Sequence, residues 1–373
     1  MITQMVDLKG QYKKIKRAVN ASIQETLDTT SFIKGPKVAA FQKNLETYLG
    51  VKHVIPCANG TDALQIAFMA LGLQPDDEVI VPAFTYVATA EVIALLRLKP
   101  IMIDVDPKTF NITAKAVEKA ITPRTKAVVP VHLFGQSADM EGIMEVANRH
   151  NLFVIEDNAQ AIGADYTFKN GEKRKAGTIG HIGCTSFFPS KNLGCYGDGG
   201  AIMTNDSELA KKITMVANHG QSKQYYHDVV GVNSRLDALQ AGILDIKLAK
   251  LDSYSSARNK AAKAYDKAFK PLKGLEIPAR AKNSNHVFHQ YTLKVKDGKR
   301  AELQAYLTEK GVPSMVYYPV PLYNQPAFAP YWNGIKLPVT EQLCTEVMSL
   351  PMHTELSADV LKQITDLVTA FFE

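Results

Sequence analysis

The chain has 373 residues, of which 46% are hydrophobic and 21% are charged, a composition typical of a folded globular protein and not of a disordered or fibrous one. Its formal net charge of +6 is too dilute over this length to indicate nucleic-acid binding, although local positive potential favours anionic small molecules. At roughly 150 residues per domain, the length predicts two or three domains.

Particular residues exclude other classes of protein. The four cysteines form no CxxC pair, so we expect no metal site and no disulfide framework, as in a reducing cytosol. The first sixteen residues lack the apolar core of a secretory signal peptide. The most apolar stretch, 92–105, is interrupted by Arg97, Lys99 and Pro100, so it is too short to cross a membrane. We therefore expect a cytoplasmic protein with no membrane partner.

In chain order, short apolar runs alternate with segments of helical periodicity. The apolar runs are 51–57, 77–83, 99–105, 126–133 and 152–158, and the helical segments between them are 61–72, 85–98, 112–121 and 139–151. This alternation is typical of βα units around a parallel sheet. In such sheets, ligands bind beyond the carboxyl ends of the strands.

The second half of the chain has a different pattern. Asn170 and Gly171 predict a hairpin turn within 166–177, whose basic residues we interpret as a solvated sheet edge. After residue 245, a charged helical stretch over 247–269 is followed by short strand-like runs such as 289–295. We therefore predict a large domain over residues 1–245 and a smaller α+β domain over 246–373.

The segment around Lys191 is the most informative for chemistry. Lys191 lies among small and aromatic residues, and four glycines follow it within nine positions. A lysine in a tight, partly desolvated site has its neutral amine favoured and can form a Schiff base with an aldehyde. The alternative is a surface lysine in a glycine-rich turn, because neither a P-loop nor a dinucleotide fingerprint is present.

Asp157 lies at the predicted end of a strand, 34 residues before Lys191. Pyridoxal phosphate needs an acidic partner that keeps its pyridine nitrogen protonated, and a carboxylate at this place would serve. The alternative is that Asp157 caps the following helix. Lys191 and Asp157 together favour the cofactor.

Two further groups fit the same ligand. Asn59, Gly60 and Thr61 form a strand-to-helix turn that suits a phosphate, and Ser186 adds a hydroxyl close to Lys191 in the sequence. A plain helix N-cap is the alternative for that turn. Tyr86 could stack on a flat ring, with simple packing as its alternative.

Four ordered motifs now identify a resemblance. The sequence ANGTDALQ, then VIEDNAQAIGA, then TSFFPSKNLGCYGDGGA, and finally VGVNSRLDALQA together resemble the DegT-type nucleotide-sugar aminotransferases. The likeness extends from residue 6 to residue 353. It implies the fold-type I architecture of pyridoxal phosphate enzymes, an α/β fold whose large domain has a mainly parallel seven-stranded sheet flanked by helices.

The resemblance also implies roles for individual residues. Lys191 would be the Schiff-base lysine and the proton shuttle, and Asp157 would pair with the pyridinium nitrogen. The other residues implied to bind the cofactor are Gly60, Thr61 and Ser186 at the phosphate, Tyr86 stacked on the ring, Gln160 near the phenolic oxygen, and Asn233 from a neighbouring subunit. The family therefore implies a homodimer with shared active sites.

The expected reaction is transamination, because relatives that dehydrate sugars carry His in place of Lys191. The resemblance implies transfer of an amino group from L-glutamate to a keto sugar on a nucleotide. The residues in these motifs most resemble those of enzymes that aminate C3 of UDP-2-acetamido-3-keto-glucuronic acid. The products of those enzymes are used in surface polysaccharides such as lipopolysaccharide O-antigen. Arg235 offers a bidentate cation for an anionic group of the substrate.

Three tyrosines depart from the pattern of those enzymes. Tyr317 and Tyr318, expected at the substrate, stand where that group has His and then Tyr, and Tyr323 stands where many family members have His. A tyrosine donates a hydrogen bond but carries no positive charge. Asn158, where Ala is common, is expected to affect only the surroundings of Asp157.

Two other functions stay open. A C4 aminotransferase for a 4-keto-6-deoxy nucleotide sugar would lack a cation facing C6 of the sugar, where a uronate carries a carboxylate. A cofactor-binding regulatory protein without turnover would have no chemical need for Lys191, Asp157, Thr61 and Ser186 together.

The remaining histidines and cysteines give no functional prediction. We interpret His132, His219 and His227 as polar core residues, and Cys184 and Cys195 as small apolar packing residues.

Overall fold

A computed structural model of the protein describes residues 4–332 and 334–373. The first three residues of the amino-terminal segment assessed for a signal peptide lie outside the described residues. Within the described ranges, no helix combines the length and the apolar character needed to cross a membrane.

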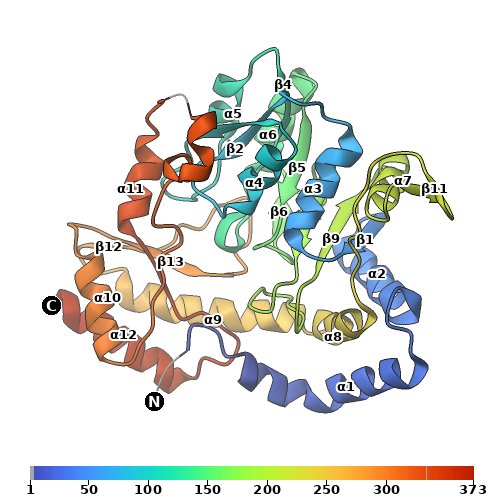
Figure 1. Cartoon of the computed structure of the whole chain (residues 1–373). Helices are drawn as coiled ribbons and strands as arrows, with labels where there is room; N and C mark the ends of the chain where they lie inside the picture. Colours follow the sequence, from blue (N-terminus) through green and yellow to red (C-terminus); the bar gives the residue numbers. More distant parts are fainter. Residues whose placement is uncertain (1–3, 333) are drawn as a thin grey trace.

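A seven-stranded sheet forms the centre of the molecule (Figure 1), in the order β1-β9-β8-β5-β4-β2-β3. Its strands are β1 (His53–Cys57), β2 (Glu78–Pro82), β3 (Lys99–Ile103), β4 (Thr125–Val128), β5 (Phe153–Asp157), β8 (Ile182–Ser186) and β9 (Gly200–Thr204). The five strands from β3 to β8 pair in parallel, whereas β9 is antiparallel to both neighbours, β1 and β8. The predicted mainly parallel sheet of seven strands is confirmed.

Helices cover both faces of this sheet. Their bounds are α3 (Gly60–Leu71), α4 (Ala88–Leu95), α5 (Ala114–Ala120), α6 (Met140–Arg149) and α7 (Ser207–Val216). Side chains of α3, α4 and α7 join one apolar cluster, and those of α5 and α6 join a second one. Within β2, Val79 and Val81 face the first cluster and Ile80 faces the second, because successive side chains of a strand point to opposite faces. Burial on both faces explains why β2 is apolar from Val79 to Pro82.

A helical layer lies beneath the sheet in Figure 1. It consists of α1 (Leu8–Thr29), α2 (Gly35–Leu49), α8 (Ala238–Leu248) and α9 (Leu251–Phe269). Both amino-terminal helices pack against α8, and apolar residues of α2 and α8 share a cluster with Phe187 and Leu193, which flank Lys191. The chain on both sides of Lys191 is thus packed into the core.

The carboxyl-terminal part builds a second, smaller sheet, in the order β12-β13-β14. Its elements are β12 (Leu275–Glu276), β13 (Tyr291–Val295), β14 (Val347–Leu350), α10 (Arg300–Glu309), α11 (Pro338–Glu346) and α12 (Ala358–Phe372). A separate apolar cluster joins α9, α10 and α12 to this sheet. Leu322, Phe328 and Leu343 instead pack against the clusters of the large sheet. The predicted domain boundary at residues 245–246 stays a prediction.

The two short hairpins test two of the sequence interpretations. The strands β6 (Asp165–Thr167) and β7 (Lys173–Lys175) pair antiparallel, which confirms the hairpin, and of its two turn residues Gly171 has the positive φ of 86°. The strands β10 (Gln221–Lys223) and β11 (Tyr226–His227) form the other. His219 and His227 at this hairpin are exposed, so their interpretation as core residues is wrong. The hairpin projects from the body of the protein (Figure 1), where no second layer covers it.

The charged stretch after residue 245 is helical over most of its length, as predicted. The charged stretch 247–269 is divided between two helices, because α8 ends at Leu248 and α9 begins at Leu251. Lys247, the first residue of this stretch, is buried, with 1% of its surface exposed.

Candidate active site

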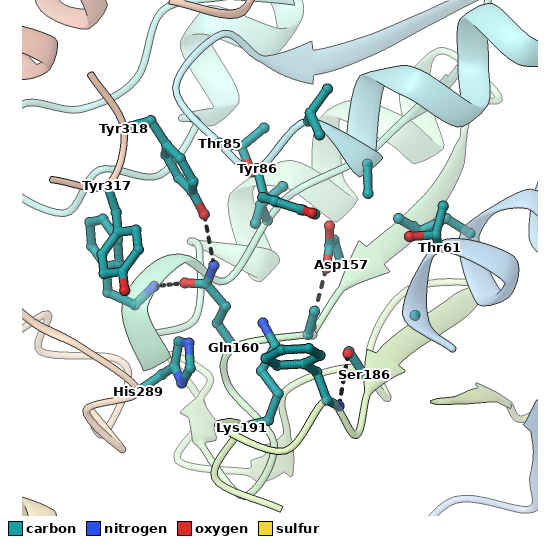
Figure 2. Close-up of a pocket in the computed structure, with 18 of the residues that line it drawn as sticks. Thr61, Thr85, Tyr86, Asp157, Gln160, Ser186, Lys191, His289, Tyr317 and Tyr318 are labelled. Atoms are coloured by element: carbon teal, nitrogen blue, oxygen red, sulfur yellow. Dashed lines mark hydrogen bonds between the residues drawn. The ribbon is translucent and has the colours of Figure 1, made fainter. Parts of the chain in front are cut away.

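A cavity of about 750 Å³ opens where several strands of the large sheet end. Its lining includes the residues that follow β2, Val131 after β4, Asp157 at the end of β5 and Ser186 at the end of β8. It thus lies beyond the carboxyl ends of the parallel strands, where ligands bind in sheets of this type. Tyr317 and Tyr318 close the cavity from a segment of the carboxyl-terminal part (Figure 2).

Lys191 points into this cavity from the loop between β8 and β9. The loop turns tightly, with the Lys191 backbone N–H donating to the carbonyl of Phe188 at 2.8 Å. Burial lowers the pKa of the Lys191 amine to about 8, and the negative charge of Asp157 offsets part of that shift. A minor fraction of the amine is therefore neutral at pH 7, but this fraction is far larger than for an ordinary lysine with a pKa of about 10.4, and the neutral form is the one that attacks a carbonyl carbon.

Three side-chain contacts hold this loop in place, one made by its own Asn192 and two by Gln240 and Lys247 of α8. Asn192 donates to the carbonyl of Val287 at 3.0 Å, and Gln240 accepts from the Tyr196 backbone N–H at 2.8 Å. The buried Lys247 amine donates to the carbonyl of Gly194 at 2.5 Å and lies 4.5 Å from the centre of the Tyr196 ring. Because these contacts come from both parts of the chain, the position of Lys191 depends on the packed tertiary structure.

Asp157 faces the same cavity and is 6% exposed. Its carboxylate accepts a hydrogen bond from the Thr89 hydroxyl at 2.8 Å and another from the Ala159 backbone N–H at 3.1 Å. The chain continues in turns after Asp157, so the alternative that it caps a following helix is wrong. The buried Asn158 amide donates to the carbonyl of Ala176 at 2.9 Å.

The residue before Asp157 forms a buried anchor for the same strand end. The Glu156 carboxylate accepts hydrogen bonds from the backbone of Gly177, Ile179 and Gly180 at 2.6–2.8 Å, and His132 lies 2.8 Å away. His132 is fully buried, as predicted. Because its Nδ1 accepts from a backbone N–H at 3.1 Å, its Nε2 carries the proton that it donates to Glu156.

One end of the cavity is suited to an anion. The helix α3 begins at Gly60, and its cap Asn59 accepts from the Asp62 backbone N–H at 2.8 Å. The backbone N–H groups of Gly60 and Thr61 precede the first intrahelical hydrogen bond and lie at the positive end of the helix dipole. A Cβ atom on Gly60 would lie 2.7 Å from the Cβ of Ser186, so glycine allows the helix start and the serine hydroxyl to lie together.

Aromatic and amide groups line the rest of the cavity (Figure 2). Tyr86 is 56% exposed, so simple core packing does not explain it. The Gln160 amide oxygen accepts from the Phe134 backbone N–H at 2.8 Å, and its nitrogen donates to the Tyr318 hydroxyl at 3.1 Å. Burial raises the pKa of both Tyr317 and Tyr318, so both phenols keep their protons.

The structure brings nine of the predicted site residues to this one cavity and leaves two outside it. Asn233 and Arg235 do not line it, and Asn233 is exposed. Tyr323 also lies elsewhere: it donates to Glu341 at 3.0 Å and stacks on Trp332 at 4.0 Å. The presence of Tyr323 where many family members have His therefore does not change the wall of this cavity.

The sequence did not predict several residues in or beside the cavity. Thr89 contacts Asp157 from behind the cavity wall and lies three residues after Tyr86 in the sequence. Thr85 and His289 line the cavity, and each has a buried side-chain atom without a hydrogen-bond partner among the described residues. No sequence signal connects His289 to the site, because almost 100 residues separate it from Lys191.

The two cysteines near Lys191 take no part in this chemistry. Burial raises the pKa of the Cys195 thiol to about 11 and that of Cys184 well above its ordinary value. Both stay protonated and serve as packing residues, as predicted.

Comparison with curated proteins gives relatives over the whole chain. The UDP-2-acetamido-2-deoxy-3-oxo-D-glucuronate aminotransferase of Pseudomonas aeruginosa is 48% identical over 98% of this chain and 99% of its own. A pleiotropic regulatory protein of Geobacillus stearothermophilus is 45% identical over 100% of this chain and 99% of its own. The UDP-N-acetyl-3-dehydro-α-D-glucosamine 3-aminotransferase of Acidithiobacillus ferrooxidans is 43% identical over 98% and 96%.

Two solved structures have the same fold. Streptomyces venezuelae DesV in complex with a ketimine intermediate superposes with a TM-score of 0.94, at 37% identity over 99% of this chain and 98% of its own. NtdA from Bacillus subtilis with bound cofactor PMP gives a TM-score of 0.89, at 33% identity over 96% of this chain and 82% of its own. A family model matches residues 13–369. The chain belongs to the DegT/DnrJ/EryC1/StrS aminotransferase family.

Proposed function

We propose that the protein is a pyridoxal phosphate-dependent transaminase that transfers an amino group from L-glutamate to C3 of a UDP-linked 3-keto sugar. The leading substrate is UDP-2-acetamido-2-deoxy-3-keto-glucuronate, used in surface polysaccharide biosynthesis. The observation that carries the proposal is the placement of Lys191 and Asp157 in one cavity that ends at the Gly60–Ser186 contact. Two relatives named as 3-keto-sugar aminotransferases support the choice of carbon.

The residues present fit the cofactor. Gly60, Thr61 and Ser186 would hold its phosphate, and the contact between Gly60 and Ser186 leaves no room for a side chain at residue 60. Tyr86 would stack on the ring, and the second hydrogen of the Gln160 amide would donate to the phenolic oxygen. When bound, pyridoxal phosphate supplies an aldehyde and an electron-withdrawing ring that stabilises negative charge beside the transferred nitrogen.

Each group of the chain has a defined task in this reaction. Lys191 would take a proton at its Nζ from one face of the substrate and return it, for which a pKa of about 8 is suitable. Asp157 would accept the hydrogen bond of a protonated ring nitrogen. Thr89 orients the Asp157 carboxylate for this task through its hydroxyl.

We further propose that the active form is a homodimer in which Asn233 reaches the phosphate of the partner's site. Support comes from the exposed position of Asn233 outside its own cavity. Large apolar side chains are also exposed on this chain, among them Tyr86, Phe188 and Val230, and exposed apolar groups of this size mark protein interfaces where they are contiguous. The cytoplasmic location and the link to O-antigen stay predictions.

The test of the main proposal is turnover with defined substrates. Purified protein loaded with pyridoxal phosphate should lose its absorbance near the violet on addition of L-glutamate and regain it with the 3-keto sugar nucleotide. Lys191→Ala should abolish both changes, whereas Lys250→Ala, at an exposed lysine, should keep them. Turnover by the Lys191→Ala protein would contradict the proposal, and NMR of the product identifies the aminated carbon.

One observation favours a substrate without a carboxylate as a second candidate. Among the residues that the structure describes around the cavity, Lys191 is the one Lys or Arg, so its own chain offers no second cation for a uronate. Such substrates include the C4 candidate, a 4-keto-6-deoxy sugar, and a 3-keto-glucosamine. If Arg235 of a partner supplies the cation, Arg235→Gln should lower kcat/KM for the uronate far more than for the uncharged sugars. Equal losses would remove the argument for a uronate.

The regulatory relative keeps a third candidate in view, a protein that binds the cofactor without turnover. The same assay distinguishes this candidate from a transaminase, because a protein without turnover would show the absorbance of the bound cofactor but no change on addition of L-glutamate. Steady amino transfer to any keto sugar would remove this candidate.

A further inference from the structure

His289 is a buried histidine whose role the proposed reaction does not yet explain. It lies in the wall of the cavity, two residues before the start of β13, and is 7% exposed. Its Nδ1 is buried and has no hydrogen-bond partner among the described residues. The Nδ1 atom has almost no surface that a ligand could touch, whereas Nε2 is not among the buried atoms without a partner, so Nε2 is the nitrogen that a ligand in the cavity can meet.

The backbone before His289 is held in an unfavourable conformation. Phe288 has a φ of 47°, which lies in the left-handed region that an aromatic residue with a Cβ rarely adopts. The His286 ring stacks on Phe288 at 3.8 Å, and His286 Nδ1 accepts the Phe288 backbone N–H at 3.0 Å. These contacts fix the turn that directs His289 toward the cavity.

A buried arginine holds the same turn from the other side. Arg258 on α9 donates to the carbonyls of Phe288, His289 and Met352 at 3.0, 3.3 and 2.9 Å. Burial lowers the pKa of its guanidinium to about 10, so it keeps its charge near neutral pH. Gly135 also packs closely against this turn, because a Cβ atom at residue 135 would lie 2.8 Å from the backbone nitrogen of His289. The position of His289 is thus specified by several elements at once.

The imidazole of His289 is uncharged. Burial, together with the charges of Lys191 and Arg258, holds its pKa well below the ordinary value. A neutral imidazole offers one donor and one acceptor. Its labelled neighbours in Figure 2 are Gln160, Tyr317 and Lys191, and among these Lys191 has to reach the reacting carbon. The groups bonded to carbons beside that carbon therefore come near His289.

We propose that His289 binds a hydroxyl group on a sugar carbon next to the reacting carbon, and that it selects for the sugar and not for the amino acid donor. This inference rests on the proposed function. A sugar hydroxyl donates and accepts one hydrogen bond each, as a neutral imidazole does. L-Glutamate instead presents a carboxylate beside its reacting carbon, and a carboxylate pairs best with a cation.

The test compares the two half-reactions in His289→Leu and His289→Asn proteins, each followed by the absorbance of the bound cofactor. For the leucine variant, kcat/KM of the sugar half-reaction should fall about 10- to 100-fold, since an unpaired polar group costs one to two factors of ten. The L-glutamate half-reaction should stay within about threefold of wild type. Asparagine, which keeps donor and acceptor groups, should restore part of the loss.

A second measurement is independent of turnover. The amino-sugar nucleotide product should bind cofactor-free wild-type protein more tightly than the His289→Leu protein, as measured by calorimetry, with matching thermal unfolding of both proteins as the fold control. His150→Leu, at an exposed histidine, should change neither half-reaction.

The outcomes separate the two proposals. Equal losses in both half-reactions would show a general structural effect and overturn the role of His289, as would unchanged sugar kinetics in the leucine variant. Failure of the wild-type protein to react with any keto sugar would overturn the proposed function instead.

Discussion

At the scale of single residues, the site depends on a few buried polar groups whose surroundings set their chemistry. Lys191 is made reactive by the removal of water around its amine, and the nearby Asp157 restores only part of the charged form. Asp157 is in turn held by Thr89. The pKa of the lysine amine, about 8, therefore lies well below the value of about 10.4 for an ordinary lysine.

The first prediction concerns the pH dependence of Lys191. In cofactor-free protein, reductive methylation of its amine should become faster as the pH rises through about 8 and then level off, because the neutral amine is the reactive form. An ordinary lysine, with a pKa of about 10.4, should continue to gain reactivity above that pH. Peptide mass spectrometry after brief labelling measures both. A profile for Lys191 that follows the ordinary lysines would contradict the desolvated site.

At the scale of elements, the site is assembled from the ends of strands and the start of a helix. The start of α3 packs directly on the end of β8, since Gly60 and Ser186 approach without an intervening side chain. The loop after β8 is then tied to α8 through Lys247 and Gln240. Each of these elements thus contributes a side chain or backbone group to the site and also restricts the movement of a neighbouring element.

The second prediction is that Gly60→Ala weakens binding of pyridoxal phosphate about tenfold or more, as expected when the phosphate loses one good hydrogen bond. The added methyl group would meet the Cβ of Ser186 at 2.7 Å and separate the helix start from the serine hydroxyl. Equilibrium titration of cofactor-free protein measures the affinity. Gly142→Ala in α6 is the control, because its added Cβ would meet mainly a flexible aspartate side chain at 3.0 Å. Equal affinities of the Gly60→Ala and wild-type proteins would count against the predicted phosphate site.

The third prediction is that Lys247→Met lowers the free energy of unfolding by about 1–3 kcal/mol, because the carbonyl of Gly194 is left without its buried donor. Urea denaturation monitored by circular dichroism measures the change. Lys250→Met, an exposed lysine on the same segment, should change stability by no more than about 0.5 kcal/mol. If both variants lose the same amount, the contact with Gly194 is not the cause.

At the scale of the whole molecule, the cavity of a single chain lacks two of the residues predicted to belong to the site. Asn233 and Arg235 lie outside the cavity to which the other nine belong. They follow the projecting β10–β11 hairpin, which carries the exposed Tyr225, and the exposed Val230 lies just after that hairpin. A second copy of the chain that brings this region to the cavity would account for both facts.

The fourth prediction tests this arrangement with mixed subunits. Lys191→Ala and Asn233→Ala proteins should each be inactive or strongly impaired, since each lacks one part of every site. Unfolding and refolding an equimolar mixture should restore about a quarter of the wild-type activity, because half of the dimers are hybrids and each hybrid has one intact site. Activity no higher than that of the separate variants would place Asn233 in the site of its own chain.

The sequence by itself determined the local elements and the chemistry of the motifs. The alternation of apolar runs and helical segments predicted five of the sheet strands, because buried parallel strands and amphipathic helices leave distinct periodic patterns. The order of motifs around Gly60, Asp157 and Lys191 was enough to indicate a cofactor lysine, an acidic partner and an anion site. These are short-range signals, each contained in about ten residues.

Tertiary structure alone decided which distant groups meet. His289 enters the cavity through a turn held by Arg258, and Tyr318 reaches Gln160 across 158 positions of the chain. His219 and His227 are exposed although the sequence suggested a core, and Lys247 is buried against the loop that carries Lys191. Burial depends on what the rest of the chain places over a residue. A local pattern therefore predicts the kind of side chain and the element that carries it, whereas its neighbours, its charge state and its role depend on the complete fold.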